Sequence, residues 1–91
     1  MPNEASPPPS LDLPAWLAEL ARVPAVGGAT ASHDEQRALL ELTRVAAHRS
    51  DRVAAPITAY IVGLALAARP SAERARALEA IVAALQGEAG S

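Results

Sequence analysis

The hydrophobic positions of this chain recur at spacings of three, four and seven residues, which is the period of amphipathic α-helices. Shorter stretches rich in Pro, Gly and Ser separate four such segments. We expect helices over residues 13–22, 33–49, 53–68 and 72–86. The pattern therefore predicts an all-α protein in the form of a small four-helix bundle.

Capping signals mark the starts of the first two helices. Asp12 precedes the first helix, and Pro14 lies in its first turn, where the missing N–H costs little. Ser32 and Glu35 match the capping box, in which each side chain binds the backbone N–H of the other residue. The pair Gly27–Gly28 predicts a turn between the two helices.

The apolar faces of the helices predict the core. Trp16 is the largest side chain of the chain, and we expect it to anchor the core from the first helix. The expected inward positions of the second and fourth helices are Leu39, Leu42, Val45, Ala46, Leu78, Ile81, Val82 and Leu85. The charged residues expected to face solvent on the fourth helix are Glu73, Arg74, Arg76 and Glu79. We expect Ser71 to cap that helix and Gly87 to end it.

The third helix differs from the others because no charged residue occurs over positions 53–68. Its smallest residues recur every four positions: Ala55, Ala59, Gly63 and Ala67. Such a ridge allows another helix to approach closely. The larger residues of the neighbouring face are Ile57, Tyr60, Ile61 and Leu64. A helix that is apolar all round is normally buried all round. We therefore expect any part that four short helices leave uncovered to contact a second copy or another protein.

The composition favours helices and argues against several other classes of protein. Alanine, the best helix former, supplies 23 of the 91 residues, whereas the chain has one Trp, one Tyr and no Phe. The formal net charge of −2 argues against nucleic acid as a partner, and the lack of Cys removes disulfides and thiolate metal sites. The longest uncharged stretch has 16 residues, fewer than the about 20 of a membrane span. We expect a cytoplasmic protein that does not bind membranes.

The distribution of proline predicts the ends of the folded domain. Five of the eight prolines occur within the first 14 residues, and the run Pro7–Pro9 favours an extended, solvated segment. We expect residues 1–10 to be a disordered Pro-rich tail and residues 11–86 to form the helical domain. Residues 87–91 are expected to be a flexible C-terminus.

The sequence contains no recognisable catalytic or cofactor-binding motif. The two His residues stand 15 positions apart, and the patterns of zinc proteases, serine hydrolases and phosphate-binding loops are missing. The neighbouring carboxylates Asp34 and Glu35 diverge on a helix and cannot share a proton. We expect a protein that is not an enzyme, without catalytic residues, metal or cofactor.

A small positive cluster is the one candidate for a ligand site. Arg44 and His48 stand four residues apart near the end of the second helix, and Arg49 and Arg52 follow. Such groups suit a phosphate or a carboxylate. The same cations also complement the negative end of the helix dipole, and Asp51 neutralises part of their charge. The sequence leaves both interpretations open.

Several short stretches of the chain carry a family resemblance. They are Trp16, Ala47–His48, Arg52, Ala54–Ala55–Pro56, Thr58 and Val62–Gly63–Leu64–Ala65. Over about residues 11–85 the chain resembles a family of small helical bacterial domains of unknown function. Members occur alone or fused to nucleotidyltransferase domains of the molybdenum cofactor guanylyltransferase type. The resemblance implies an auxiliary domain linked to molybdenum cofactor maturation. It also draws attention to His48, Arg52 and Thr58, which flank the start of the third helix.

Two hypotheses about function follow. The first is a non-enzymatic interaction domain that pairs with itself as a homodimer or docks on a nucleotidyltransferase through the third helix. The alternative is a module that binds a small anion or a nucleotide through Arg44, His48 and Arg52, with Thr58 beside them.

Overall fold

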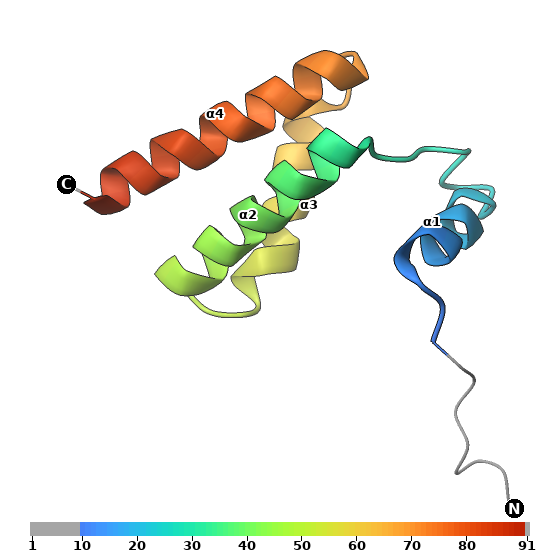
Figure 1. Cartoon of the computed structure of the whole chain (residues 1–91), viewed down its shortest axis with the longest axis horizontal. Helices are drawn as coiled ribbons and strands as arrows, with labels where there is room; N and C mark the ends of the chain where they lie inside the picture. The colour runs from blue at the N-terminus through green and yellow to red at the C-terminus, as the bar shows by residue number, and fades with distance from the viewer. Residues whose placement is uncertain (1–9, 91) are drawn as a thin grey trace, which may run out of the picture. The chain divides into compact units, whose positions relative to one another are not determined.

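The computed structural model describes residues 10–90, with side chains up to Gly87 (Figure 1). It contains α1 (Leu13–Ala21), α2 (His33–Arg49), α3 (Ala54–Leu66) and α4 (Ser71–Gly90). No strand occurs among these residues, so the predicted all-α class with four helices is confirmed. The predicted Pro-rich tail lies, except for Ser10, outside the described residues. The chain divides into two compact units, one ending at Thr30 and the other beginning at Ala31.

The first unit consists of α1 and the loop that follows it. The Asp12 carboxylate accepts a hydrogen bond from the Ala15 N–H at 2.9 Å, which confirms the predicted cap. Pro14 lies in the first turn, as expected. Gly27 and Gly28 have φ angles of 64° and 83°, the left-handed region that glycine adopts without strain, so the predicted turn is also confirmed.

Within the first unit, Trp16 is not buried as the expected anchor of a core. Its side chain is 50% exposed, and Leu13 and Leu20 on the same helix are exposed as well. The core cluster contains no residue of α1. Because α1 has only nine residues and its own unit adds only a short loop, that unit offers no second apolar surface against which Trp16 can be buried.

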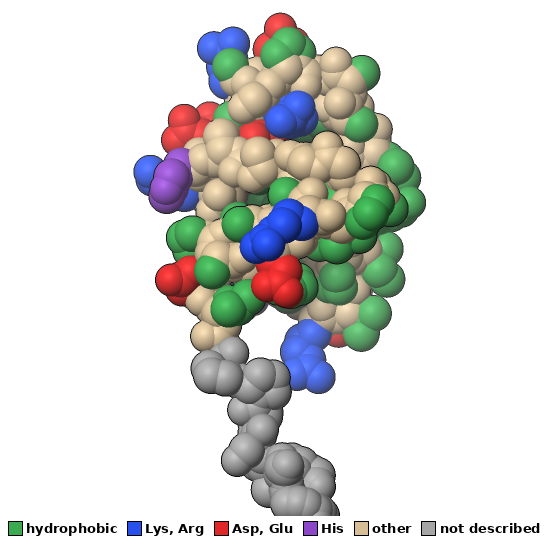
Figure 2. All heavy atoms as spheres, turned by 90° about the vertical axis from the view of Figure 1, so that its right-hand side faces the viewer, with side chains coloured by type: hydrophobic (Ala, Val, Ile, Leu, Met, Phe, Trp, Pro, Cys, Tyr) green, Lys and Arg blue, Asp and Glu red, His purple; other side chains and the backbone are tan. Residues whose placement is uncertain are grey.

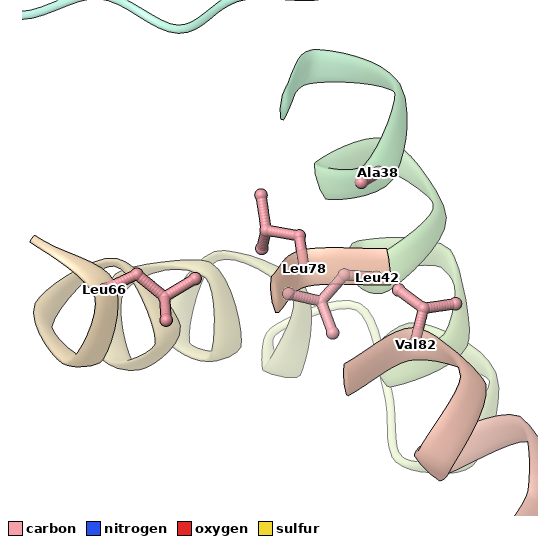
Figure 3. Packing of buried hydrophobic residues seen from close by; sticks show 5 residues of the cluster. All are labelled: Ala38, Leu42, Leu66, Leu78 and Val82. Atoms are coloured by element: carbon pink, nitrogen blue, oxygen red, sulfur yellow. The ribbon is translucent and has the colours of Figure 1, made fainter. Parts of the chain in front are cut away.

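The core of the second unit lies where α2 packs against both α3 and α4, whereas α3 and α4 touch at few positions. In Figure 1, α2 and α3 run in opposite directions. The buried cluster comprises Ala38 and Leu42 from α2, Leu66 from α3, and Leu78 and Val82 from α4 (Figure 3). Leu42 is fully buried, at 0% exposure. The remaining predicted inward residues are buried or half-buried, so the predicted faces of α2 and α4 are confirmed.

The predicted start of α2 is confirmed, whereas the predicted start and end of α4 are wrong. The capping box is present: the Ser32 hydroxyl accepts from the Glu35 N–H at 3.1 Å, and the Glu35 carboxylate accepts from the Ser32 N–H at 2.7 Å. Ser71 does not cap α4 but is its first residue, because the Pro70 carbonyl accepts the first helical N–H groups. Gly87 does not end α4. A glycine ends a helix through a positive φ, which Gly87 lacks.

The most apolar helix, α3, is shorter than expected and spans 13 residues. It has no side-chain cap of its own, although the Asp51 carboxylate accepts a hydrogen bond from the Val53 N–H at 2.9 Å just before it. Among the described residues, no helix combines the length and the apolar character that crossing a bilayer would require.

Candidate functional site

One face of α3 packs within the second unit, and it carries mainly small side chains. Ala55, Thr58, Ala59 and Val62 are half-buried, and Leu66 is buried at 6% exposure. These positions follow the helical period and lie on the side that contacts α2. Small side chains on this side let the two helices pack closely.

Most of the large apolar side chains of α3, together with Val53 just before it, lie on the other side of the helix and are exposed in the second unit. Val53, Ile57, Tyr60, Ile61 and Leu64 are 64%, 54%, 69%, 57% and 61% exposed, and we call these five residues the α3 outer face. Their spacings of three, four and seven place them on one continuous stripe. Figure 2 shows hydrophobic side chains gathered along one edge of that view. The helix thus has two apolar sides, and the second unit by itself covers only the side that carries mainly small residues.

The predicted small-residue ridge is divided between these two sides. Ala55 and Ala59 are half-buried, whereas Gly63 and Ala67 are exposed. A Cβ atom placed on Gly63 would meet no other group within 4 Å, so the space beside this glycine is open. Within the second unit, only the first two residues of the ridge, Ala55 and Ala59, therefore lie between α3 and a neighbouring helix. A role of its second half in oligomer contact stays a prediction.

A buried ion pair between α2 and α4 is a polar feature that the sequence did not predict. Glu35 is only 5% exposed, and its carboxylate accepts from Arg74 Nε at 2.5 Å and from the Ser71 hydroxyl at 3.4 Å. Arg74, expected to face solvent, has a side chain only 27% exposed and also donates to the Arg69 carbonyl at 2.7 Å. The capping box was the only signal in the sequence, because the partner lies 39 residues away.

The environment of Glu35 fits a structural role. Burial by itself would raise the pKa of the carboxyl, but the hydrogen bond from Arg74 and those involving Ser32 outweigh it and lower the pKa below its ordinary value of 4.5. The charge of Arg74 acts in the same direction. A carboxylate held ionised by several donors is a poor proton donor or acceptor. Glu35 therefore connects the starts of α2 and α4.

The described residues offer no metal-binding cluster of three or more His, Asp or Glu side chains. An open hollow beside α2 and α4 has both signs of charge in its lining, which consists of Asp34, Arg37, Ala38, Leu40, Glu41 and Glu79. Its surface is shallow and lacks the enclosing apolar walls that small-molecule sites usually have.

The residues of the predicted anion site are mostly exposed, and one of them is already paired. Arg44, His48 and Arg52 are exposed, and Thr58 is half-buried. Arg44 Nε donates to the Glu41 carboxylate at 3.2 Å, and the same two side chains form a second, closer contact. This pairing lowers the pKa of Glu41 and raises that of Arg44. This pairing reduces the positive charge that Arg44 offers to an anion.

Comparison with known families places this fold in context. The model of a domain of unknown function, DUF6457, matches residues 8–91. The chain belongs to this family. The match covers the part of the chain that carried the resemblance and confirms a domain of unknown function. No curated protein and no solved structure matches this DUF6457 domain.

The pairing of Arg44 in this DUF6457 domain leads to a testable expectation about anions. We expect millimolar inorganic phosphate to move the NMR signals of the His48 ring only slightly. In Glu41→Gln the guanidinium loses its carboxylate partner, so we expect phosphate to bind about threefold more tightly there, the range typical of an exposed ion pair. Glu79→Gln, which removes the same charge from α4, is the control. Equal phosphate shifts in the wild type and in Glu41→Gln would contradict this expectation.

Proposed function

We propose that this DUF6457 domain functions as a non-enzymatic interaction domain, and that the α3 outer face is the surface by which it binds another protein chain. The observation that carries the proposal is the exposure of five large apolar side chains, each between 54% and 69%, on one continuous stripe. Single exposed apolar residues are normal on protein surfaces, but contiguous apolar patches are typical of binding sites.

The size of the α3 outer face supports this proposal. From the usual areas of such side chains and their exposed fractions, the stripe presents roughly 500 Å² of apolar surface. The largest patch on a typical monomer reaches about 300–600 Å² and is often functional. The stripe is therefore at the upper end of what a soluble monomer leaves exposed.

The chemistry of the surface favours a protein over other partners. No charged side chain occurs over positions 53–68, so the helix has neither the Lys and Arg residues that bind phosphate backbones nor those that attract anionic lipid headgroups. Tyr60 combines an apolar ring with a hydroxyl group, and protein interfaces are enriched in this residue type. An uncharged helical stripe suits another apolar helix or groove.

The wider context that we propose is molybdenum cofactor maturation. Its support is the sequence resemblance over residues 11–85, strongest between Arg52 and Ala65, to domains that also occur fused to guanylyltransferase-type nucleotidyltransferases. The segment from Arg52 to Ala65 contains all five residues of the α3 outer face. Under this proposal the domain acts as an accessory to such enzymes and has no catalytic residues of its own.

Photocrosslinking in cells tests whether the α3 outer face binds a protein. A benzophenone amino acid at position 64 is expected to give a covalent protein adduct, because Leu64 lies within the proposed contact. The same group at position 40 is the control, since Leu40 is equally apolar and 67% exposed but lies on α2. No adduct from position 64, or equal adducts from both positions, would contradict the proposal. An adduct with a guanylyltransferase would support the proposed context.

A further inference from the structure

We infer that the occupant of the α3 outer face is a second copy of the same chain, which forms a symmetric dimer through α3. This inference rests on the proposed function and specifies the partner at that surface. Both chains of such a dimer would present the same stripe of Val53, Ile57, Tyr60, Ile61 and Leu64. Two-fold symmetry places identical patches against each other, which is the commonest arrangement of soluble oligomers.

The area of the stripe is about what a weak dimer needs. Two stripes of roughly 500 Å² bury at most about 1,000 Å² together, which is about the least that a biological interface requires and below the area of stable ones. The exposed small residues beside the stripe, Gly63, Ala65, Ala67 and Ala68, add to this area without holding the helices apart. An interface of this size predicts a dimer that dissociates on dilution.

The lack of charged groups on the α3 outer face favours a second copy of the chain over a charged partner. The stripe carries no charged group, and a charged partner would lose its hydration there without gaining an ion pair. A second copy supplies an uncharged apolar stripe of the same length. A second copy would also bury the side of α3 that the second unit leaves uncovered, so that both apolar sides of the helix would be buried.

Sedimentation equilibrium of the full chain tests this inference. The wild type is expected to pass from monomer to dimer as its concentration rises through the micromolar range. Leu64→Glu places a carboxylate from each chain in the contact and is expected to raise the dissociation constant at least about 30-fold. Leu40→Glu is the matched control. It adds the same charge at a leucine that is 67% exposed on α2, compared with 61% for Leu64, and it is expected to dimerise like the wild type.

Helical circular dichroism establishes that both variants are folded, and dilution of the wild type tests the dimer without any substitution. A wild type that stays monomeric at the highest concentration would overturn the inference, and so would a dimer that Leu64→Glu leaves intact. A monomer that still forms an adduct with another protein from position 64 overturns the dimer but leaves the proposed function standing. A monomer in which the Trp16 ring shows NMR contacts to Ile61 would mean that the chain covers its own α3, which overturns both.

Discussion

Leu42→Ala is expected to leave about half of the protein unfolded at 25 °C. Among the described residues, Leu42 is the one large side chain that is fully buried, and it lies where α2 meets α3 and α4. Truncating a buried leucine removes its transfer free energy and leaves a cavity, which together cost about 4 kcal/mol. A single core of this size rarely supplies more than about 3–5 kcal/mol, so the loss removes nearly all of the free energy of unfolding.

The matched control for this prediction lies two residues away. Leu40 is on the same helix and is 67% exposed, so Leu40→Ala removes the same atoms from a side chain that is mostly in water. We expect it to change the free energy of unfolding by less than about 0.5 kcal/mol. Urea titration followed by helical circular dichroism, at one fixed protein concentration, measures both variants. Equal effects of the two substitutions would show that the core does not lie where α2, α3 and α4 meet.

Glu35→Ala is expected to lower the free energy of unfolding by about 3 kcal/mol, because it removes one partner of a buried ion pair and opens the capping box. The Arg74 guanidinium would lose its carboxylate, and the Ser32 N–H would lose its acceptor. The partial exposure of Arg74, 27%, keeps the loss at the lower end of the range for buried pairs. Glu79→Ala, which removes an exposed carboxylate, serves as the control.

Glu35→Gln separates the two contributions of this side chain. A glutamine side chain still accepts from the Ser32 N–H, so the capping box is kept, while the charge opposite Arg74 is lost. We therefore expect Glu35→Gln to be destabilised less than Glu35→Ala, by about 1.5 kcal/mol. Denaturant midpoints of the two variants, measured together, give this difference. If Glu35→Gln is as unstable as Glu35→Ala, the whole loss of stability comes from the missing charge and none from the capping box.

The ion pair of Glu35 and Arg74 also makes the free energy of unfolding depend on pH in the acid range. The pKa of Glu35 is lower in the folded chain than its ordinary value of 4.5, so the unfolded chain binds the proton more readily. The stabilisation is therefore complete at neutral pH and is lost as the pH falls below 4.5 towards the folded pKa. In Glu35→Gln this part of the acid sensitivity disappears. Glu41, whose pKa is also lowered, retains its own contribution.

The helices and their ends were largely predictable from the sequence, because they depend on residues only a few positions apart. The capping box of Ser32 and Glu35, the cap at Asp12 and the turn at Gly27–Gly28 all involve local hydrogen bonds or local φ angles. The end of α4 was not predictable in the same way. Gly87 tolerates both a helical and a left-handed conformation, and in the structure it adopts the helical one.

The candidate site depended on tertiary structure much more than the helices did. The sequence singled out Arg44 for a ligand, but the side chain pairs with Glu41 in the next turn. It identified Glu35 as a capping residue, but the ion pair with Arg74 depends on how α2 and α4 pack, which no local pattern records. Trp16 has the hydrophobicity of a core residue, but its own short unit provides nothing to bury it.

By itself, the sequence determined that this is an all-α chain with four helices, where most of them begin, and which faces of α2 and α4 are buried. It also determined that α3 is apolar on every side. Only the tertiary structure decided which side of α3 is covered, and it covers the side with Ala55 and Ala59. The physical reason is that both sides gain from burial in proportion to their area, so hydrophobicity alone does not choose between them. The choice follows from packing, because small side chains let α2 approach α3 closely and leave the larger stripe exposed.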